Sequence, residues 1–344
     1  MSARECVIPV FVPHLGCPND CVFCNQRRIS GSTEPATAAD VDKAIEKAAA
    51  LLPSGAKRQL AFYGGSFTAI PVSEQISLLS AAKRWLDSGD IQALRLSTRP
   101  DAIDGEVLKR LKYYGVETIE LGAQSMCNEV LNLSGRGHTA EDVENASRMI
   151  KAAGFRLILQ MMTGLPGDTK ERTKETAERI IALKPDGVRI YPTVIVRDTA
   201  LYDLWQAGLY EEHSVEKAVD YCAAIVPLFE KAGIPIIRLG LNPTEELSSG
   251  AAAGGAYHPA LGELVKSRLM LNFAREVLQN AHIPPQSAVT LGVKSAKISQ
   301  MTGQHRCNIA ALTEEFSLAT LKIRAHDVKN GEVEILSVET GEKL

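Results

Sequence analysis

Three cysteines within eight residues are the clearest chemical signal in the sequence. Cys17, Cys21 and Cys24 are spaced C-x3-C-x2-C, in a segment that also contains glycine and proline. Thiolates are soft ligands, and such a cluster is typical of zinc, copper(I) or iron–sulfur sites. A structural zinc takes four protein ligands, and an electron-transfer cluster also takes four cysteines. Three cysteines on a 4Fe–4S cluster leave one iron open to another molecule, and we favour this interpretation.

A zinc knuckle is the alternative, with His14 or a distant cysteine as the fourth ligand. The remaining cysteines fall in segments predicted as strand or helix, where a free cysteine usually behaves as a small buried hydrophobic residue. These are Cys6, Cys127, Cys222 and Cys307.

The composition is that of an ordinary globular protein. The chain has 344 residues, 45% hydrophobic and 23% charged, with a formal net charge of −3. This charge gives no general attraction to DNA or to an anionic membrane, although a local RNA contact stays open. The first residues lack the apolar stretch of a signal peptide, and no apolar run is long enough to span a bilayer. We therefore expect a cytoplasmic protein with reduced cysteines and with neither a membrane nor a DNA partner.

Strand and helix patterns alternate six times, beginning with an apolar, β-branched run at residues 6–11. This alternation, in units of about 30–45 residues, predicts an α/β fold with a parallel sheet and right-handed crossovers. Polar and glycine-rich stretches lie where the strands end, the edge at which (β/α) barrels build their active sites. A barrel-like sheet is therefore favoured, and its closure is left open.

The pattern changes after Gly240. We expect residues 1–240 to form the barrel, residues 241–282 a Gly/Ala-rich loop and a connecting helix, and residues 283–344 a small α+β subdomain. Near its end, Asn330 and Gly331 between two predicted strands indicate a hairpin.

Two glycine-rich turns follow predicted strands. Gly64, Gly65 and Ser66 come after the second strand, as either a tight turn or a place where backbone groups approach a ligand. The stretch G-L-P-G-D follows the fifth strand. There Asp168, with Glu171 three residues later, is expected to cap the next helix.

Polar side chains follow the fourth strand. The amide of Gln124 can bond a ribose or an amino acid, and Arg136 can bind a carboxylate through two hydrogen bonds. Spacing alone favours a plainer interpretation of Arg136, as a solvated charge before a helix capped by Thr139 and Asp142.

The order of these motifs resembles that of the radical S-adenosylmethionine superfamily. The cysteine segment has an aromatic residue before its last cysteine, and the glycine turn, Gln124, Arg136 and G-L-P-G follow in the superfamily's order. More narrowly, S-T-R-P-D, L-G-A-Q-S and R-G-H-T resemble the catalytic subunit of Elongator. The resemblance covers most of residues 6–240, and the rest resembles the small domain that follows the barrel in short bacterial relatives.

The resemblance implies a partial (β/α)6 TIM-like barrel with a 4Fe–4S cluster on Cys17, Cys21 and Cys24 and S-adenosyl-L-methionine on its open iron. An external one-electron reductant of the flavodoxin or ferredoxin type would drive cleavage to a 5′-deoxyadenosyl radical, which abstracts hydrogen from the substrate. By analogy the region of Phe23 contacts adenine, the glycine turn holds the amino group, and the remaining residues bond the ribose and the carboxylate. The residues expected to bind this cofactor are Phe23, Gly64, Gly65, Ser66, Gln124 and Arg136.

RNA or tRNA is the leading hypothesis for the substrate. Radical oxidation or methylation of a small metabolite, as in coproporphyrinogen oxidase, is the enzymatic alternative, and a zinc- or cluster-binding protein without activity is the third. Tyr191, Tyr202 and His258 are the residues expected near the substrate at the barrel mouth. The residues after Gly240 contain no Gly-rich pyrophosphate loop, so acetyl-CoA chemistry is not expected to carry over.

Overall fold

The computed structural model describes residues 5–12, 21–24, 35–51, 56–242, 247–329 and 331–340. The chain divides into two compact units, residues 1–214 with 224–257, and residues 215–223 with 258–344. Helix α9 (Val215–Lys231) therefore contributes residues to both units. The three-part domain division at residues 240 and 282 stays a prediction.

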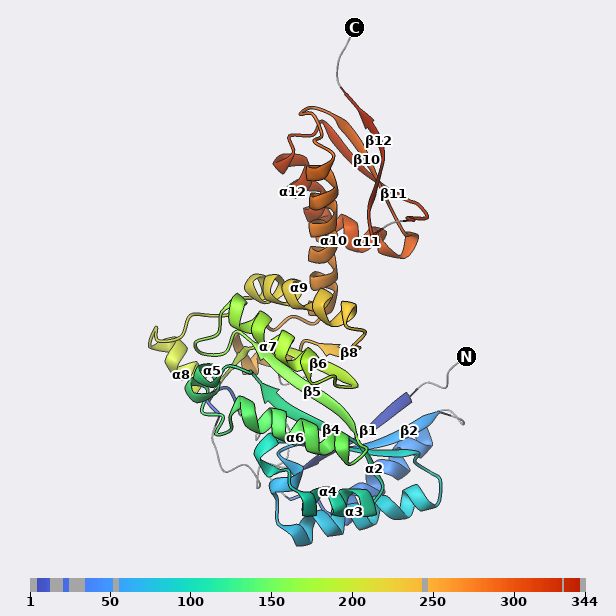
Figure 1. The fold of residues 1–344 in the computed structure, drawn as a ribbon, viewed down its shortest axis with the longest axis vertical. Helices are drawn as coiled ribbons and strands as arrows, with labels where there is room; N and C mark the ends of the chain where they lie inside the picture. Colours follow the sequence, from blue (N-terminus) through green and yellow to red (C-terminus); the bar gives the residue numbers. More distant parts are fainter. Residues whose placement is uncertain are drawn as a thin grey trace. The chain divides into compact units, whose positions relative to one another are not determined.

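A seven-stranded parallel sheet forms the first unit (Figure 1). It curls into a half-barrel, which confirms the predicted α/β fold with a partial TIM-like barrel and adds one strand, β8, to the expected six. The strands, in their order across the sheet, are β1 (Glu5–Val12), β2 (Lys57–Gly64), β3 (Ala93–Thr98), β4 (Val116–Gln124), β5 (Arg156–Thr163), β6 (Gly187–Pro192) and β8 (Ile236–Leu239).

Helices follow the strands because apolar residues recur at helical spacing between them. Within β4, fully buried Ile119 and Leu121 alternate with the charged Glu120, so the two faces of the sheet differ in chemistry. The helices of this unit, apart from α9, are α2 (Ala38–Leu51), α3 (Val72–Asp87), α4 (Gly105–Tyr113), α5 (Asn128–Leu133), α6 (Ala140–Ala152), α7 (Lys170–Ala182) and α8 (Ala200–Gln206).

The sequence predicted capping residues at the starts of α6 and α7. Thr139 and Asp142 form a full capping box at α6, as predicted. The prediction that Asp168 caps α7 is wrong, because Thr169 is the N-cap and accepts a hydrogen bond from the Arg172 N–H at 3.2 Å. The Asp168 carboxylate instead accepts the Gly164 N–H at 2.7 Å and so closes the preceding turn.

A small antiparallel pair, β7 (Val194–Val196) with β9 (Ala252–Gly255), was not predicted. Strand β9 lies inside the stretch expected to be Gly/Ala-rich loop. Gly255 has φ +81°, and a Cβ there would lie 2.7 Å from the Thr193 carbonyl oxygen, so this close pairing requires glycine.

The second unit has a three-stranded sheet in the order β11-β10-β12. Strand β10 (Ala288–Val293) pairs in parallel with β11 (Thr320–Ala325) and antiparallel with β12 (Glu334–Glu339). The predicted hairpin is therefore wrong, because β11 and β12 lie on opposite sides of β10. Strand β10 is central because its apolar side chains, Val289, Leu291 and Val293, are almost completely buried.

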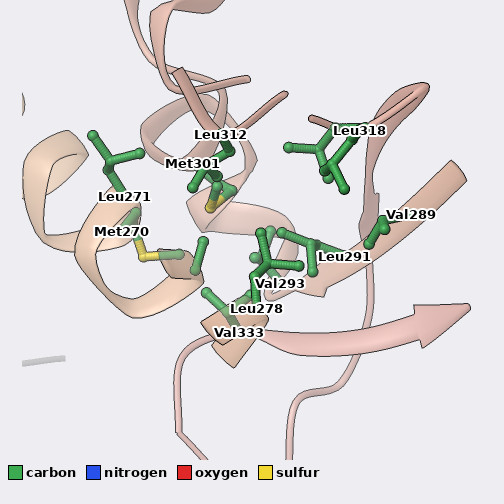
Figure 2. Close-up of a cluster of buried hydrophobic side chains, with 12 residues drawn as sticks. Met270, Leu271, Leu278, Val289, Leu291, Val293, Met301, Leu312, Leu318 and Val333 are labelled. Carbon is green, nitrogen blue, oxygen red and sulfur yellow. The ribbon is translucent and has the colours of Figure 1, made fainter. Parts of the chain in front are cut away.

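The core of this unit lies between the sheet and three helices, α10 (Leu261–Asn280), α11 (Ile298–Thr302) and α12 (Cys307–Glu315). Figure 2 shows side chains from all these elements meeting, including Leu278 of α10, Leu291 of β10 and Leu312 of α12. Across both units, none of the helices formed by the described residues is long and apolar enough to span a bilayer.

Candidate active site

The glycine turn lies against the end of β1, the strand that precedes the cysteine segment in the sequence. Val12 and Gly64 are register partners, and the Gly65 N–H donates to the Val12 carbonyl at 2.8 Å. Gly64 has φ +106°, and a Cβ there would lie 2.6 Å from the same carbonyl oxygen. The two strand ends can approach this closely only because Gly64 has no side chain. Cys17 and His14 lie outside the described residues.

Residues 21–24 form a turn that backbone hydrogen bonds fix on both sides. The Cys24 N–H donates to the Cys21 carbonyl at 3.0 Å. The Val22 N–H donates to the Ser134 carbonyl at 3.0 Å, and the Val22 carbonyl accepts the Leu201 N–H at 2.7 Å. Ser134 follows α5 and Leu201 lies in the first turn of α8, so two distant parts of the chain position this turn.

Phe23 lies in an apolar cluster. It packs, partly buried, against a core of Ile195, Leu201 and Tyr210. The ring therefore anchors the cysteine turn to α8 and β7, a role that the sequence did not indicate. Its predicted contact with adenine stays a prediction.

Arg136 reaches from the segment before α6 to the cysteine turn. Its Nη1 donates to the Cys21 sulfur at 3.5 Å, and its Nη2 donates to the Gly122 carbonyl at 3.1 Å. The side chain is only 9% exposed, so the interpretation as a solvated loop charge is wrong. Its Nε is buried and has no hydrogen-bond partner among the described residues.

Gln124 ends β4 with φ +63°, a left-handed conformation that non-glycine residues rarely adopt. Its carboxamide forms two hydrogen bonds with that of Gln160 on β5, at 3.1 and 2.7 Å. A Cβ on Gly122 would lie 2.8 Å from both the Arg136 Nη2 and the Gln124 Nε2. The absence of a side chain at Gly122 thus leaves room for both polar groups. Gln160 was missed, although its position as a polar residue inside the apolar run L-I-L-Q-M-M was a signal.

A buried charge network links β2, β3, β4 and β6. The Glu120 carboxylate accepts hydrogen bonds from Arg95 at 2.9 Å, from the Arg189 Nε at 2.8 Å and from the Tyr63 hydroxyl at 2.9 Å. Arg189 also donates to the Tyr191 hydroxyl at 3.5 Å. Glu120 and Arg95 are almost completely buried, whereas Arg189 and the two tyrosines are partly exposed.

Two guanidinium groups therefore face one carboxylate in this network. Burial, and then the Glu120 carboxylate, raise the pKa of Tyr63 to about 12, so its hydroxyl stays protonated and donates. Sequence reasoning missed the other members of the network, Tyr63, Arg95, Glu120 and Arg189, and named only Tyr191. The signal available was a single charge inside otherwise apolar parallel strands, as in L-R-L, I-E-L and V-R-I, because buried charges are rarely unpaired.

His138 is buried beside the end of β4 and is neutral. Its Nε2 lies 3.2 Å from the Ala123 carbonyl, to which it donates in the neutral tautomer. Burial, followed by the positive charge of Arg136, lowers the pKa of His138 to about 4. The ring thus holds the segment around Arg136 against the end of β4.

The residues predicted near the substrate have different surroundings. Tyr191 lies on β6 beside Arg189, while Tyr202 on α8 packs against Trp205, with ring centroids 6.0 Å apart. His258 belongs to the second unit, where its Nδ1 accepts the Ala260 N–H at 3.1 Å. Their meeting at one substrate stays a prediction.

Ser66 is buried after the glycine turn, at the start of a single 3-10 turn.

Of the four cysteines expected to be buried, Cys222 is buried, Cys6 and Cys127 are partly buried, and Cys307 is exposed. The described residues contain no cluster of three or more His, Cys, Asp or Glu suited to a metal ion, and they include two of the three motif cysteines.

Two family models match most of the chain. One is described as the radical SAM superfamily and matches residues 11–180, and the other is the radical SAM C-terminal domain, which matches residues 185–270. The chain belongs to the radical SAM superfamily. It is thus an enzyme of this superfamily, and the cysteine turn, the glycine turn and Arg136 all lie within the first match.

Curated relatives resemble part of this radical SAM enzyme. A tRNA uridine(34) acetyltransferase of Methanocaldococcus jannaschii is 34% identical over 141 residues, 39% of this chain and 26% of the relative. Elongator complex protein 3 of Homo sapiens is 30% identical over 179 residues, 51% of this chain and 32% of the relative. The match thus spans between about a quarter and a third of the length of these relatives.

A solved structure shares the fold. It is the archaeal Elp3 of Methanocaldococcus infernus with an N-terminal deletion, with a TM-score of 0.62 and 22% identity. The match covers 83% of this chain and 71% of that chain.

Proposed function

We propose that this radical SAM enzyme holds a 4Fe–4S cluster on Cys17, Cys21 and Cys24, uses it to cleave S-adenosyl-L-methionine, and modifies RNA. The observation that carries the proposal is the position of Arg136 between the Cys21 sulfur and the Gly122 carbonyl, with its Nε buried and unpartnered among the described residues. A buried guanidinium nitrogen without an acceptor is costly. A carboxylate ligand beside the cysteine turn would remove that cost.

The donor set fits both groups. Thiolates in a three-cysteine motif suit an iron–sulfur cluster with one open iron, and the buried Arg136 Nε, which has no partner among the described residues, suits the carboxylate of S-adenosyl-L-methionine. When bound, the reduced cluster supplies the electron that splits S-adenosyl-L-methionine into methionine and a 5′-deoxyadenosyl radical. The electron would come from a flavodoxin- or ferredoxin-type protein.

The chain's own residues would bind and orient S-adenosyl-L-methionine, and they would exclude water from the site. Arg136 would hold the carboxylate of the bound S-adenosylmethionine through Nε, and Gly64 and Gly65 would admit its amino group. Gln124 would offer its amide to the ribose. The charge network around Glu120 joins four strands, so it would keep the sheet rigid and fill space that water would otherwise take.

RNA is supported as the substrate by the names of the relatives, which include a tRNA uridine(34) acetyltransferase. Radical oxidation or methylation of a small metabolite is the alternative. Bulk tRNA binding separates them, because a tRNA enzyme binds at low salt with an affinity that falls steeply as salt is raised. Absence of tRNA binding at low salt would favour the small substrate.

Anaerobic reconstitution with iron and sulfide tests the cluster. We expect about four iron atoms per chain, lost in Cys21→Ala and retained in Cys307→Ala, which removes an exposed cysteine of the second unit. Dithionite with S-adenosyl-L-methionine should then release 5′-deoxyadenosine. Zinc bound without iron under the same protocol contradicts the proposal.

A further inference from the structure

The two faces of the seven-stranded sheet differ in exposure. On β4, β5 and β6, the side chains of one face are completely buried, as in Leu121, Leu159 and Ile190. The other face, which we call the Glu120 face, has partly exposed side chains toward the carboxyl ends of the strands. They include Tyr63, Gln160, Met162, Arg189, Tyr191 and Arg238. The Glu120 face is therefore open to another molecule at these positions.

This face carries more positive than negative charge. Past the first residue of each strand, the described residues place three guanidinium groups on it, those of Arg95, Arg189 and Arg238, and one carboxylate, that of Glu120. Arg238 donates to two backbone carbonyls, at 3.1 and 3.3 Å, which leave its charge in place. Two positive charges thus have no countercharge among the described residues of this face, which favours an anionic ligand.

The Arg189 guanidinium has one N–H left for such a ligand, out of five. Two donate to the Glu120 carboxylate, from Nε at 2.8 Å and from Nη2 at 3.1 Å. A third donates to the Tyr63 hydroxyl at 3.1 Å and a fourth, on Nη1, to the Tyr191 hydroxyl at 3.5 Å. The second N–H of Nη1 and the hydroxyl hydrogen of Tyr191 have no acceptor among the described residues, so two free donors lie side by side.

The deeper part of the network is also short of acceptors. Arg95 is 7% exposed, and its Nε is buried with no acceptor in the part of the chain that the structure describes. Its Nη1 donates to the Glu120 carboxylate, which already accepts from Arg189 and Tyr63. A group that only accepts hydrogen bonds and is negatively charged would complement this network.

We propose that Arg189 and Tyr191 bind a phosphate group of the nucleotide substrate. The proposal rests on the RNA substrate proposed above and names the residues that hold it. A carboxylate usually takes two parallel hydrogen bonds from one guanidinium, and Glu120 already occupies that edge of Arg189. The donors that remain belong to two different side chains, which suits the several oxygens of a phosphate.

The proposed phosphate site lies beside the residues proposed to bind S-adenosyl-L-methionine. Arg189 is the register partner of Gln160, whose carboxamide bonds that of Gln124. Gly122, the register partner of Gln160 on its other side, accepts the Arg136 guanidinium through its carbonyl. A nucleotide held by its phosphate at Arg189 would thus lie within two strands of these residues, on the same face of the sheet.

The test compares the binding of uridine, uridine 5′-monophosphate and uridine 3′-monophosphate to the reconstituted full chain by isothermal titration calorimetry. At least one monophosphate should bind the wild type about tenfold or more tightly than uridine does. Arg189→Gln should abolish this preference and leave uridine binding unchanged, because Arg95 still pairs with Glu120 at 2.9 Å. Arg189→Lys should keep much of the preference, because lysine binds phosphate as a point charge.

Two further variants complete the test. Tyr191→Phe keeps the ring and every charge, and it should weaken monophosphate binding by about 2- to 10-fold. It tests the site even where an Arg189 variant is poorly folded, which circular dichroism of each variant detects. The matched control is Arg156→Gln, which removes a half-exposed guanidinium from the same sheet and should leave the preference unchanged.

The proposal is overturned by a wild type without a preference for either monophosphate, by a full preference in both Arg189→Gln and Tyr191→Phe, or by an equal loss in Arg156→Gln. Glutarate binding as tightly as the monophosphates would also overturn it. Displacement of a monophosphate by bulk tRNA at low salt supports RNA as the source of the phosphate. A preference that depends on Arg189 without any tRNA binding supports the site and overturns RNA, whereas tRNA binding without such a preference supports RNA and overturns the site.

Discussion

Arg136 and Cys21 are 115 residues apart in the chain, yet the guanidinium Nη1 of one lies 3.5 Å from the sulfur of the other. The contact holds a positive charge beside a thiolate ligand of the proposed cluster, and the Gly122 carbonyl fixes the other end of the guanidinium. A single side chain thus joins the cysteine turn to the end of β4.

Replacing Arg136 by glutamine should weaken binding of S-adenosyl-L-methionine to the reconstituted protein by about 10- to 100-fold, because a hydrogen bond between charged groups contributes about 1.5–3 kcal/mol. Iron content should stay close to that of the wild type, because the cysteines are unchanged. Equilibrium dialysis measures the binding. Arg148→Gln, on the exposed side of α6, is the control, and an equal effect there would contradict the assigned role.

Gly64→Ala should destabilise the protein far more than Gly89→Ala. Both glycines have positive φ, but a Cβ at Gly64 meets the Val12 carbonyl at 2.6 Å while one at Gly89 meets nothing within 4 Å. Strain alone costs about 1–2 kcal/mol, and overpacking adds about 1–3 kcal/mol. Denaturant unfolding of the two variants measures the difference, and equal losses would show that Val12 moves away freely.

Glu120→Gln should cost about 3–5 kcal/mol, because it leaves the Arg95 and Arg189 guanidinium groups without their buried countercharge. Glu117→Gln on the same strand is the matched control. Its carboxylate forms an exposed pair with Arg156 at 3.7 Å, so its loss should cost less than about 1 kcal/mol. The measurement is the free energy of unfolding in urea, and a small loss for Glu120→Gln would mean that water enters the network.

His138 should make stability depend on pH. Its pKa is lowered in the folded protein from 6.5 to about 4, so the folded state resists protonation. The stability it contributes is present above pH 6.5 and is lost as pH falls toward 4, by about 3 kcal/mol in total. Cluster-free wild type and His138→Gln, unfolded in urea at pH 5 and 7.5, should differ in this loss. The same loss in both would assign the pH dependence to other groups.

The sequence predicted the parallel sheet and the helices between its strands because apolar periodicity is local information. A connecting helix was expected within residues 241–282, and α10 (Leu261–Asn280) lies there. The hairpin prediction failed because Gly331 indicates only that the chain turns. Which strand pairs with β11 depends on tertiary packing, and that strand is β10, whose apolar side chains are buried.

The sequence predicted which residues belong to the candidate site, but it did not predict which of them are in contact. Cys21 and Gly64 were identified, but the role of Arg136 depends on a fold that brings it to Cys21. Glu120 and Arg189 were passed over because each is one charge in an apolar strand. Their role as one buried charge network is evident only in the fold, where four strands bring the side chains together.

The mutual hydrogen bonds of Gln124 and Gln160 have a further consequence. A carboxamide has an acceptor oxygen on one side and a donor nitrogen on the other. Rotating both carboxamides by 180° exchanges the oxygen and nitrogen positions of each and preserves the two hydrogen bonds between them. Among the described residues, the exchange loses only the 3.3 Å hydrogen bond from Gln160 to the Met161 carbonyl. The pair can therefore accept a hydrogen bond from an incoming hydroxyl in one orientation and donate one to it in the other.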